Sequence, residues 1–245
     1  MSEYPRFTFP ADIMIHMSDP ARICRAADMM RFMQESATRQ LEEYGPTMRE
    51  MQSMGRAFIL SRISIDFPEP AHTFERINCT TWPCSSSRGA AFERCFELLR
   101  RDTVVAVGMS QWALLDYRNR RLLRVEDADI AFTRDEVVET TLPLRFRIPK
   151  DCALVPVGEK TVLHSDIDTN HHMNNTRYCD LFCDFLPMDG MRVSALAVSF
   201  QKEAVLGEKI TVLRSESPDA DGNYYFRTLR GSDGDVNTEA VIKLV

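Results

Sequence analysis

The sequence predicts an α+β protein in which one plan, a helix followed by an antiparallel meander, occurs twice. Three observations carry this prediction. A helical apolar period covers residues 19–45, four strand-like runs follow it, and the same order returns in the second half of the chain. At 245 residues the chain is long enough for one large domain or for two modules that each bury a core. The repeat favours two modules.

The first helix is expected between two backbone signals, Asp19-Pro20 at its start and Gly45-Pro46 at its end. Apolar residues at helical spacing fall near one face, among them Met30 and Met33. Strands are expected after the helix, because runs of strand-forming residues alternate there with short turn-forming segments. These strands cover residues 57–67, 73–82, 90–99 and 103–117.

The second copy is expected after a linker at residues 134–150, which contains Pro143 and Pro149. The two modules are therefore placed at residues 1–133 and 151–245. Within the second, a short strand is expected at residues 160–164 and a helix at residues 175–186. Further strands are expected at residues 195–202, 209–215, 224–229 and 238–245.

A gapless superposition of the two helices indicates which copy carries chemistry. It places Asp19 on Asp168, Ala21 on Asn170 and Ile23 on His172. The first copy keeps the acid but lacks the amide and the imidazole. A local echo, Glu75-Arg76-Ile77 against Glu208-Lys209-Ile210, agrees with a duplication. We therefore expect the chemistry in the second copy and a binding cavity in the first.

Composition excludes several classes of protein. A formal net charge of -6 and a pI near 5.5 argue against a nucleic-acid binder, which would carry a basic face. No uncharged apolar run is long enough to span a bilayer, so no membrane insertion is expected. The seven cysteines form no CxxC pair and follow no signal peptide, which predicts reduced thiols and a cytoplasmic location.

Acid, amide and imidazole groups are concentrated in residues 164–178, immediately before the second helix. Three of the five histidines lie there. Asn174 or Asn175 is expected to cap the helix, leaving backbone N–H groups directed at whatever lies in front of it. The positive end of the helix dipole also suits a developing oxyanion.

These residues carry a resemblance to a known family. The pattern Asp168-x-Asn170-x-His172-x-Asn174-Asn175-x-x-Tyr178 resembles the active-site motif of acyl-acyl-carrier-protein (acyl-ACP) thioesterases of plants and bacteria. In the first copy, Trp82-Pro83 and Trp112-x-x-x-Asp116 resemble the same family's strand pattern. The resemblance implies two tandem hot-dog domains, each an antiparallel sheet wrapped around a central helix. It also implies an acyl pocket in the first domain and catalysis in the second.

The resemblance assigns roles residue by residue. The catalytic set that it implies is Asp168, Asn170, His172 and Glu203. Ala204 stands where the family often has Cys, which puts an essential cysteine nucleophile in doubt, and Leu181 stands where the family commonly has Trp. The residues expected to bind substrate are Met30, Met33, Asn174, Asn175 and Tyr178. For the methionines, ordinary core filling is the competing interpretation.

The expected reaction is hydrolysis of a fatty-acyl-ACP thioester to free fatty acid and carrier thiol in fatty acid biosynthesis. Glu203 or Asp168 could activate water or attack the carbonyl directly, and the sequence leaves both routes open. No cofactor is implied. Two alternatives remain at this stage: an acyl-CoA thioesterase, and a non-catalytic acyl-binding or regulatory protein. Homodimerisation is also left open.

Two further features were weighed against plainer interpretations. A metal site built from the histidines and acids of residues 164–172 is disfavoured, because adjacent histidines are not the i, i+4 pair that presents two ligands on one helix face. The acidic carrier protein needs a local basic surface on a chain that is itself acidic. We expect that surface, or alternatively a plain solubilising loop, at Arg118, Arg120, Arg121 and Arg124.

Overall fold

The computed structural model describes residues 5–84, 89–127 and 137–245. The chain divides into two compact units, Met1–Thr140 and Thr141–Val245. This division lies within the segment expected as a linker. The expected end of the first domain at residue 133 lies outside the described residues, so the proposed domain limits stay a prediction.

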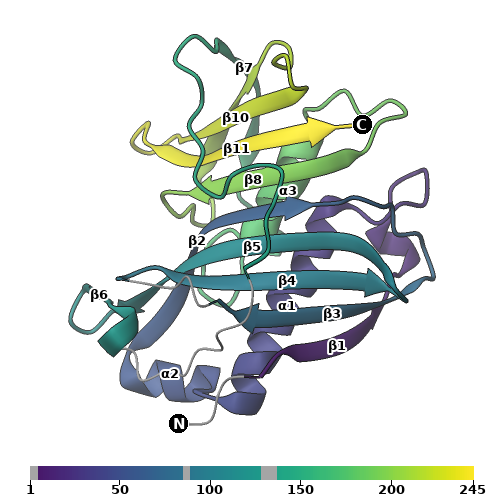
Figure 1. The fold of residues 1–245 in the computed structure, drawn as a ribbon. Helices are drawn as coiled ribbons and strands as arrows, with labels where there is room; N and C mark the ends of the chain where they lie inside the picture. The colour runs from purple at the N-terminus through teal and green to yellow at the C-terminus, as the bar shows by residue number, and fades with distance from the viewer. Residues whose placement is uncertain (1–4, 85–88, 128–136) are drawn as a thin grey trace. The chain divides into compact units, whose positions relative to one another are not determined.

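The first unit is an antiparallel sheet with one long helix against it (Figure 1). Its strands follow the order β1-β3-β4-β5-β2, and β6 pairs with β5. The strands are β1 (Phe7–Asp12), β2 (Arg56–Asp66), β3 (Arg76–Pro83), β4 (Phe92–Arg100), β5 (Thr103–Asp116) and β6 (Arg121–Leu123). The helices are α1 (Ala26–Tyr44), α2 (Met48–Met54) and the 3₁₀ turns η1 (Ile15–Met17) and η2 (Val125–Asp127).

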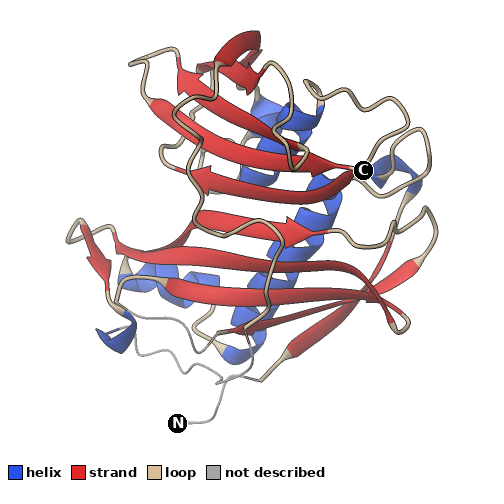
Figure 2. Ribbon diagram, turned by 45° about the horizontal axis from the view of Figure 1, so that its top comes forward, coloured by secondary structure: helices blue, strands red, loops and turns tan. Residues whose placement is uncertain are grey.

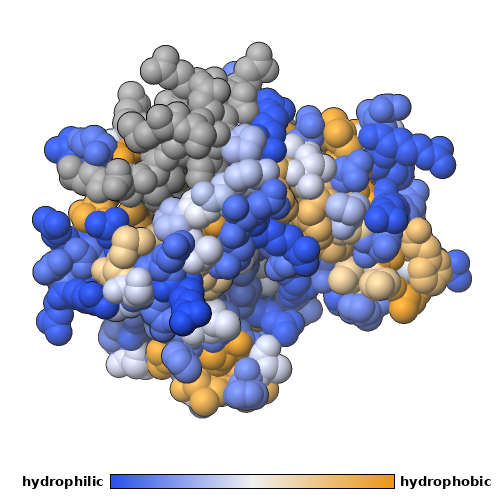
Figure 3. Space-filling model, turned by 90° about the horizontal axis from the view of Figure 1, so that it is seen from below, coloured by the Kyte–Doolittle hydropathy of each residue, from blue (hydrophilic) through white to orange (hydrophobic). Residues whose placement is uncertain are grey.

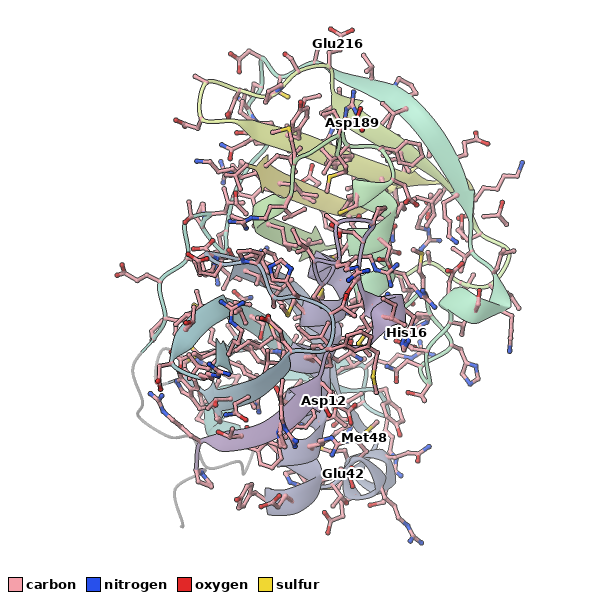
Figure 4. The ribbon with its side chains drawn as sticks, turned by 90° about the vertical axis from the view of Figure 1, so that its right-hand side faces the viewer. Asp12, His16, Glu42, Met48, Asp189 and Glu216 are labelled. Carbon is pink, nitrogen blue, oxygen red and sulfur yellow. The ribbon has the colours of Figure 1, made fainter. Side chains whose placement is uncertain are left out.

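Helix α1 packs its methionine-rich face on the sheet, against β1 and β3 (Figure 2). Met30 and Met33 are completely buried. Gly108 on β5 lies beside Met33, and a Cβ there would be 3.4 Å from Met33 Cε and a close 3.1 Å from the Ser64 carbonyl oxygen. Glu42 near the end of α1 accepts a hydrogen bond from the Met48 N–H at the start of α2, at 2.7 Å (Figure 4).

The second unit repeats this plan with a shorter helix. Its strand order is β8-β11-β10-β9-β7, all antiparallel. Phe182 of the helix packs on Phe226 with ring centroids 4.9 Å apart. The elements are β7 (Leu154–Thr161), η3 (His164–Asp166), α3 (Asn175–Cys183), β8 (Val193–Phe200), β9 (Lys209–Ser215), β10 (Asn223–Arg230) and β11 (Val236–Leu244).

The expected fold class is confirmed, and the eight strands expected after the two helices are present with small shifts of their ends. Three expectations were wrong. Helix α1 begins at Ala26 and not at residue 19, because Asp19-Pro20 opens a turn instead. The strand expected at residues 160–164 is β7, which begins earlier and ends at Thr161, and α3 ends at Cys183. The sequence also missed β1, α2 and β6.

Candidate active site

The loop before α3 is anchored by the buried carboxylate of Asp166. Its Oδ2 accepts hydrogen bonds from the Leu163 N–H at 2.9 Å and from Lys160 Nζ at 2.7 Å. Its backbone carbonyl accepts the Asn174 N–H at 2.9 Å. Burial alone would raise the pKa of Asp166, but the bonds from Lys160 and Leu163 outweigh burial and hold that pKa below its usual value. Asp166 therefore holds both ends of the loop, the first end through its buried carboxylate and the end at Asn174 through its backbone carbonyl.

Asp168 closes a tight turn inside this loop. Its Oδ1 accepts the Asn170 N–H at 2.8 Å, while its own N–H donates to the His172 carbonyl at 2.9 Å. His171 adopts a left-handed backbone with φ of 64° to complete the turn. The carboxylate of Asp168 thus has a structural task, holding the backbone on which Asn170 and His172 are displayed.

His172 and Glu203, which are distant in sequence, meet at the edge of the second unit. His172 and Val205 form an antiparallel bridge, and the Met173 N–H donates to the Ala204 carbonyl at 2.8 Å. His172 Nε2 consequently lies 3.7 Å from Glu203 Oε1. This separation is longer than a direct hydrogen bond, but catalytic contacts are often long without substrate. The side chains of His172 and Glu203 are 37% and 63% exposed, so both are open to solvent.

Ala204 is completely buried, and its methyl group offers no chemistry. A cysteine nucleophile cannot act at this position. The acidic group that the structure brings to the imidazole is therefore the carboxylate of Glu203.

Asn174 is the N-cap of α3, one of the two residues expected in that role. Its Oδ1 accepts the Thr176 N–H at 2.9 Å and the Thr176 hydroxyl at 2.7 Å. Asn175 is the first residue of the helix and is half-buried. Because the cap occupies one first-turn N–H group, the helix end has fewer donors for an oxyanion than the sequence alone implies.

Tyr178 lies in the core of the second unit and is 2% exposed. Its ring packs edge-on against Phe200, with centroids 5.8 Å apart. Burial raises the pKa of Tyr178 to about 12, so the phenol stays neutral. Asn237 is its hydrogen-bond partner.

A buried polar group that the sequence did not indicate holds the segment that carries Glu203. The carbonyl of Asn237 accepts the N–H groups of Gln201 and Lys202 at 2.9 and 3.1 Å, and its side-chain amide donates to the Lys202 carbonyl. Arg230 Nη1 donates to the Glu203 carbonyl at 3.2 Å. These long-range contacts have no local motif, so no pattern along the chain could have revealed them.

The first unit contains the same backbone arrangement without the reactive side chains. The Asp19 N–H donates to the Ile23 carbonyl at 2.9 Å, and the Cys24 N–H donates to the Ala71 carbonyl at 2.8 Å. Arg22 has φ of 65°, as His171 has 64°. The expected alignment of Asp19, Ala21 and Ile23 with the second-copy motif is therefore confirmed in geometry.

The alignment extends to the opposite side of each loop. The Ile13 N–H bonds to the Glu75 carbonyl as the Val162 N–H bonds to the Glu208 carbonyl, each at 2.9 Å. By this register Pro70 stands where the second unit has Glu203. Of the four implied catalytic positions, the first unit retains only the turn-forming aspartate.

The arginines expected to dock a carrier protein are all exposed: Arg118 and Arg120 lie in the β5–β6 turn, Arg121 begins β6 and Arg124 follows it. Arg118 donates to the Ser53 carbonyl at 2.6 Å, Arg121 lies 3.8 Å from Asp116, and Arg124 pairs with Glu126 at 2.7 Å. These contacts are intramolecular and at the surface, where they contribute little to stability. Figure 3 shows hydrophilic side chains over much of the surface it displays, with hydrophobic ones in separate patches.

Two comparisons with known proteins bear on this site. Residues 6–132 match the acyl-ACP thioesterase N-terminal domain, and residues 157–244 match the acyl-ACP thioesterase C-terminal domain. The chain belongs to the acyl-ACP thioesterase family. Both halves of this thioesterase are accounted for, and the second match contains the loop of His172 and the carboxylate of Glu203. No curated protein sequence matches the chain.

Solved structures similar to this thioesterase share its fold over nearly the whole chain. An acyl-ACP thioesterase from Bacteroides thetaiotaomicron has a TM-score of 0.86 at 18% identity, covering 98% of each chain. A 12:0-ACP thioesterase from Umbellularia californica has a TM-score of 0.82 at 17% identity, covering 98% of this chain and 97% of its own. At this identity the likeness establishes the tandem hot-dog fold.

Residues 5–84, 89–127 and 137–245 contain no group of three or more His, Cys, Asp or Glu side chains that could hold a metal ion. Within the same ranges, no helix has both the length and the apolar character needed to cross a membrane.

The Lys160–Asp166 pair predicts an acid-sensitive loop. Because the folded pKa of Asp166 is below the unfolded value of about 3.9, the pair stabilises the fold above that pH and this stabilisation is lost as pH falls through the folded pKa. Lys160→Met should lower the free energy of unfolding by roughly 1–3 kcal/mol at pH 7, since it leaves a buried charge without its partner. Urea denaturation from pH 7 to pH 3 measures this loss, which should shrink below about pH 4.

Lys209→Met is the matched control, because it removes the same charge from an exposed position of the same unit. It should leave the free energy of unfolding close to that of the wild type. An equal loss in both variants would show that Lys160 acts through net charge alone.

Two substitutions at Asp168 distinguish its role in holding the turn from any role of its negative charge. Asp168→Ala removes the oxygen that holds the Asn170 N–H and should lower kcat/KM strongly, because His172 is then displayed on a loosened loop. Asp168→Asn keeps an acceptor oxygen and should retain more of kcat/KM. Asp19→Ala, the same change in the first unit, should leave it near the wild-type value. If the Asn and Ala variants at 168 were equally inactive in thiol-release assays, the carboxylate charge itself would be needed.

Proposed function

We propose that this protein hydrolyses fatty-acyl-ACP thioesters, releasing free fatty acid and the carrier thiol, with Asp168, Asn170, His172 and Glu203 as its active site. The observation that carries the proposal is the 3.7 Å approach of His172 Nε2 to Glu203 Oε1 in the one unit that has both groups. Membership of the acyl-ACP thioesterase family supports thioester hydrolysis as the reaction. An acyl carrier protein as the natural donor is part of the proposal.

The proposed chemistry begins with a water molecule held between His172 and Glu203. Glu203 takes a proton from the water as the oxygen attacks the thioester carbonyl carbon. The carbonyl oxygen becomes an oxyanion, which accepts hydrogen bonds from the Asn170 side-chain amide and from backbone N–H at the α3 N-terminus. When the intermediate collapses, the carbon–sulfur bond breaks and the thiolate leaves, to be protonated by the acid that Glu203 has become.

Each group has a distinct task in this scheme. His172 orients Glu203 and the water, while Asp168 holds the turn that presents Asn170 and His172. Direct attack by Glu203 to form an acyl-enzyme would use the same residues. Label found in the Glu203 carboxylate after a single turnover in H₂¹⁸O would establish the acyl-enzyme, with water attacking its Glu203 carbonyl carbon, whereas direct attack of water on the thioester labels the fatty acid only.

The distal part of the acyl chain is assigned to the first unit, with Met30 and Met33 beside it. Both side chains are buried on α1, and Met33 packs over Gly108, which satisfies core packing as well. Flexible thioethers adapt to an alkyl chain, and each methylene excluded from such a pocket forfeits roughly 0.8 kcal/mol of burial. Asn174, Asn175 and Tyr178 contribute the helix cap and the packing that shape the proposed site on the other unit.

The proposal is tested by removing the carboxylate and the imidazole separately. Glu203→Gln and His172→Ala should each lower kcat for an acyl-ACP by roughly 10²–10⁴-fold, the effect expected of a positioned acid–base group. Thiol release measures the rate, and circular dichroism confirms folding. Glu208→Gln is the matched control, a carboxylate five residues further along that should leave kcat nearly unchanged. A near-normal rate in Glu203→Gln would remove that residue from the mechanism.

The carrier specificity is tested on one acyl chain presented on two thiols. If the arginines of the β5–β6 turn dock the carrier protein, reversing Arg120 and Arg121 to Glu should raise KM for acyl-ACP and leave acyl-CoA hydrolysis nearly unchanged. Added salt should weaken the wild-type reaction with the same selectivity, because exposed charges are screened over about 8–10 Å. Equal effects on both substrates would place the docking surface elsewhere. Faster turnover of acyl-CoA in the wild type would make CoA the favoured thiol.

A further inference from the structure

Two buried cysteines in the first unit lie in contact although the proposed chemistry uses neither. The sulfur atoms of Cys84 and Cys95 are 2.7 Å apart, closer than two unbonded sulfur atoms ordinarily approach. Both residues have no solvent exposure, and both are free thiols. The contact joins the segment that leaves β3 to the middle of β4.

The strand register explains why these thiols meet. Trp82 on β3 is paired with Cys95 on β4, and the Cys84 N–H donates to the Glu93 carbonyl at 2.8 Å. Cys84 and Cys95 are therefore diagonal neighbours, two positions apart on adjacent strands and on the same face of the sheet. A disulfide needs a sulfur separation of about 2.05 Å, so the sulfur atoms have only about 0.7 Å left to close.

The side chains around the pair are apolar, and the pKa values of the two thiols shift in opposite directions. Trp82, Met109 and Val138 pack around them. Either thiol can donate in this contact, but only Cys95 of the two also accepts the Val138 N–H, at 3.4 Å. The contact with Cys84 lowers the pKa of Cys95, burial opposes this effect, and the Val138 N–H adds to it. The same contact, reinforced by burial, raises the pKa of Cys84. Cys95 is thus the better first nucleophile of the two.

We propose that Cys84 and Cys95 are a disulfide-forming pair, oxidised by a small two-electron oxidant of the peroxide class. The Cys95 thiolate attacks one peroxide oxygen, the O–O bond breaks, and the departing hydroxide takes a proton, which gives a sulfenic acid and one water. The Cys84 sulfur then attacks the Cys95 sulfur, the S–O bond breaks, and a second water forms. Two thiols lose two electrons in total, and one peroxide becomes two waters.

The resulting bond ties the segment after β3 to β4 across a sequence separation of 11, and it restricts the conformations open to the unfolded chain. Oxidation should therefore raise the thermal stability of the first unit without touching the groups assigned to catalysis. Cys79 offers a matched control. It lies on β3, is as deeply buried as Cys84 and Cys95, and has its pKa raised to about 12 by that burial.

The test oxidises the full-length reduced protein with hydrogen peroxide and maps its peptides by mass spectrometry after denaturation and alkylation. A Cys84–Cys95 linked peptide is expected, with loss of two of the seven free thiols. The unfolding midpoint should rise by roughly 5–10 °C and return after dithiothreitol. Cys79→Ala should behave as the wild type, whereas Cys84→Ala and Cys95→Ala should show neither the linked peptide nor the rise.

Recovery of both Cys84 and Cys95 as alkylated free thiols, or as unlinked sulfinic acids, would overturn the proposal. A linked peptide that joins other cysteines would do the same. If the alanine variants fail to fold, the peptide map of the wild-type protein decides the question alone.

Discussion

The candidate site depends on one backbone hydrogen bond, from the Met173 N–H to the Ala204 carbonyl. It joins the loop that ends in α3 to the segment that follows β8, and the adjacent bridge between His172 and Val205 fixes their register. A slip of one residue would turn His172 away from Glu203, because neighbouring side chains on an extended segment point to opposite faces. Backbone pairing between the two segments, and not a side-chain contact, therefore determines that His172 and Glu203 lie close together.

Three acids in and around the candidate site have different physical surroundings. Asp166 is buried and paired with Lys160, so its charge stabilises the loop and is withdrawn from chemistry. Glu203 is exposed, so its carboxylate is open to solvent. Asp168 stands between these cases, since Asp19 closes a turn of matching backbone in a unit that lacks the imidazole, there by accepting the Ile23 N–H at 2.9 Å. An aspartate retained without its chemical partners is best explained by the turn.

The parts of the fold that depend on interactions between residues close in sequence were predicted from the sequence. Strand runs, the Asn174 cap and the repeat itself follow from short-range propensity and capping, and each is found in the structure. The predicted start of α1 at residue 19 was wrong, because an Asp-Pro pair opens a turn as readily as a helix. The contacts of Asn237 with residues 201–202, and of Lys160 with Asp166 beneath the loop, have no sequence signature. Glu203 was linked to His172 by family resemblance, since no spacing rule joins residues so far apart.

The loop of the first unit that contains Asp19 and Ile23 has the backbone of the candidate site without its amide, imidazole and carboxylate. Deleting a group shows only that it is necessary. The matching positions in the first unit carry other side chains: Ala21, Ile23 and Pro70 stand where the second unit has Asn170, His172 and Glu203. Introducing those three side chains into the first unit would ask whether they are sufficient for hydrolysis on this backbone. Whatever separates the first unit from an active one must lie in its side chains and their surroundings, since the course of the main chain is already in place.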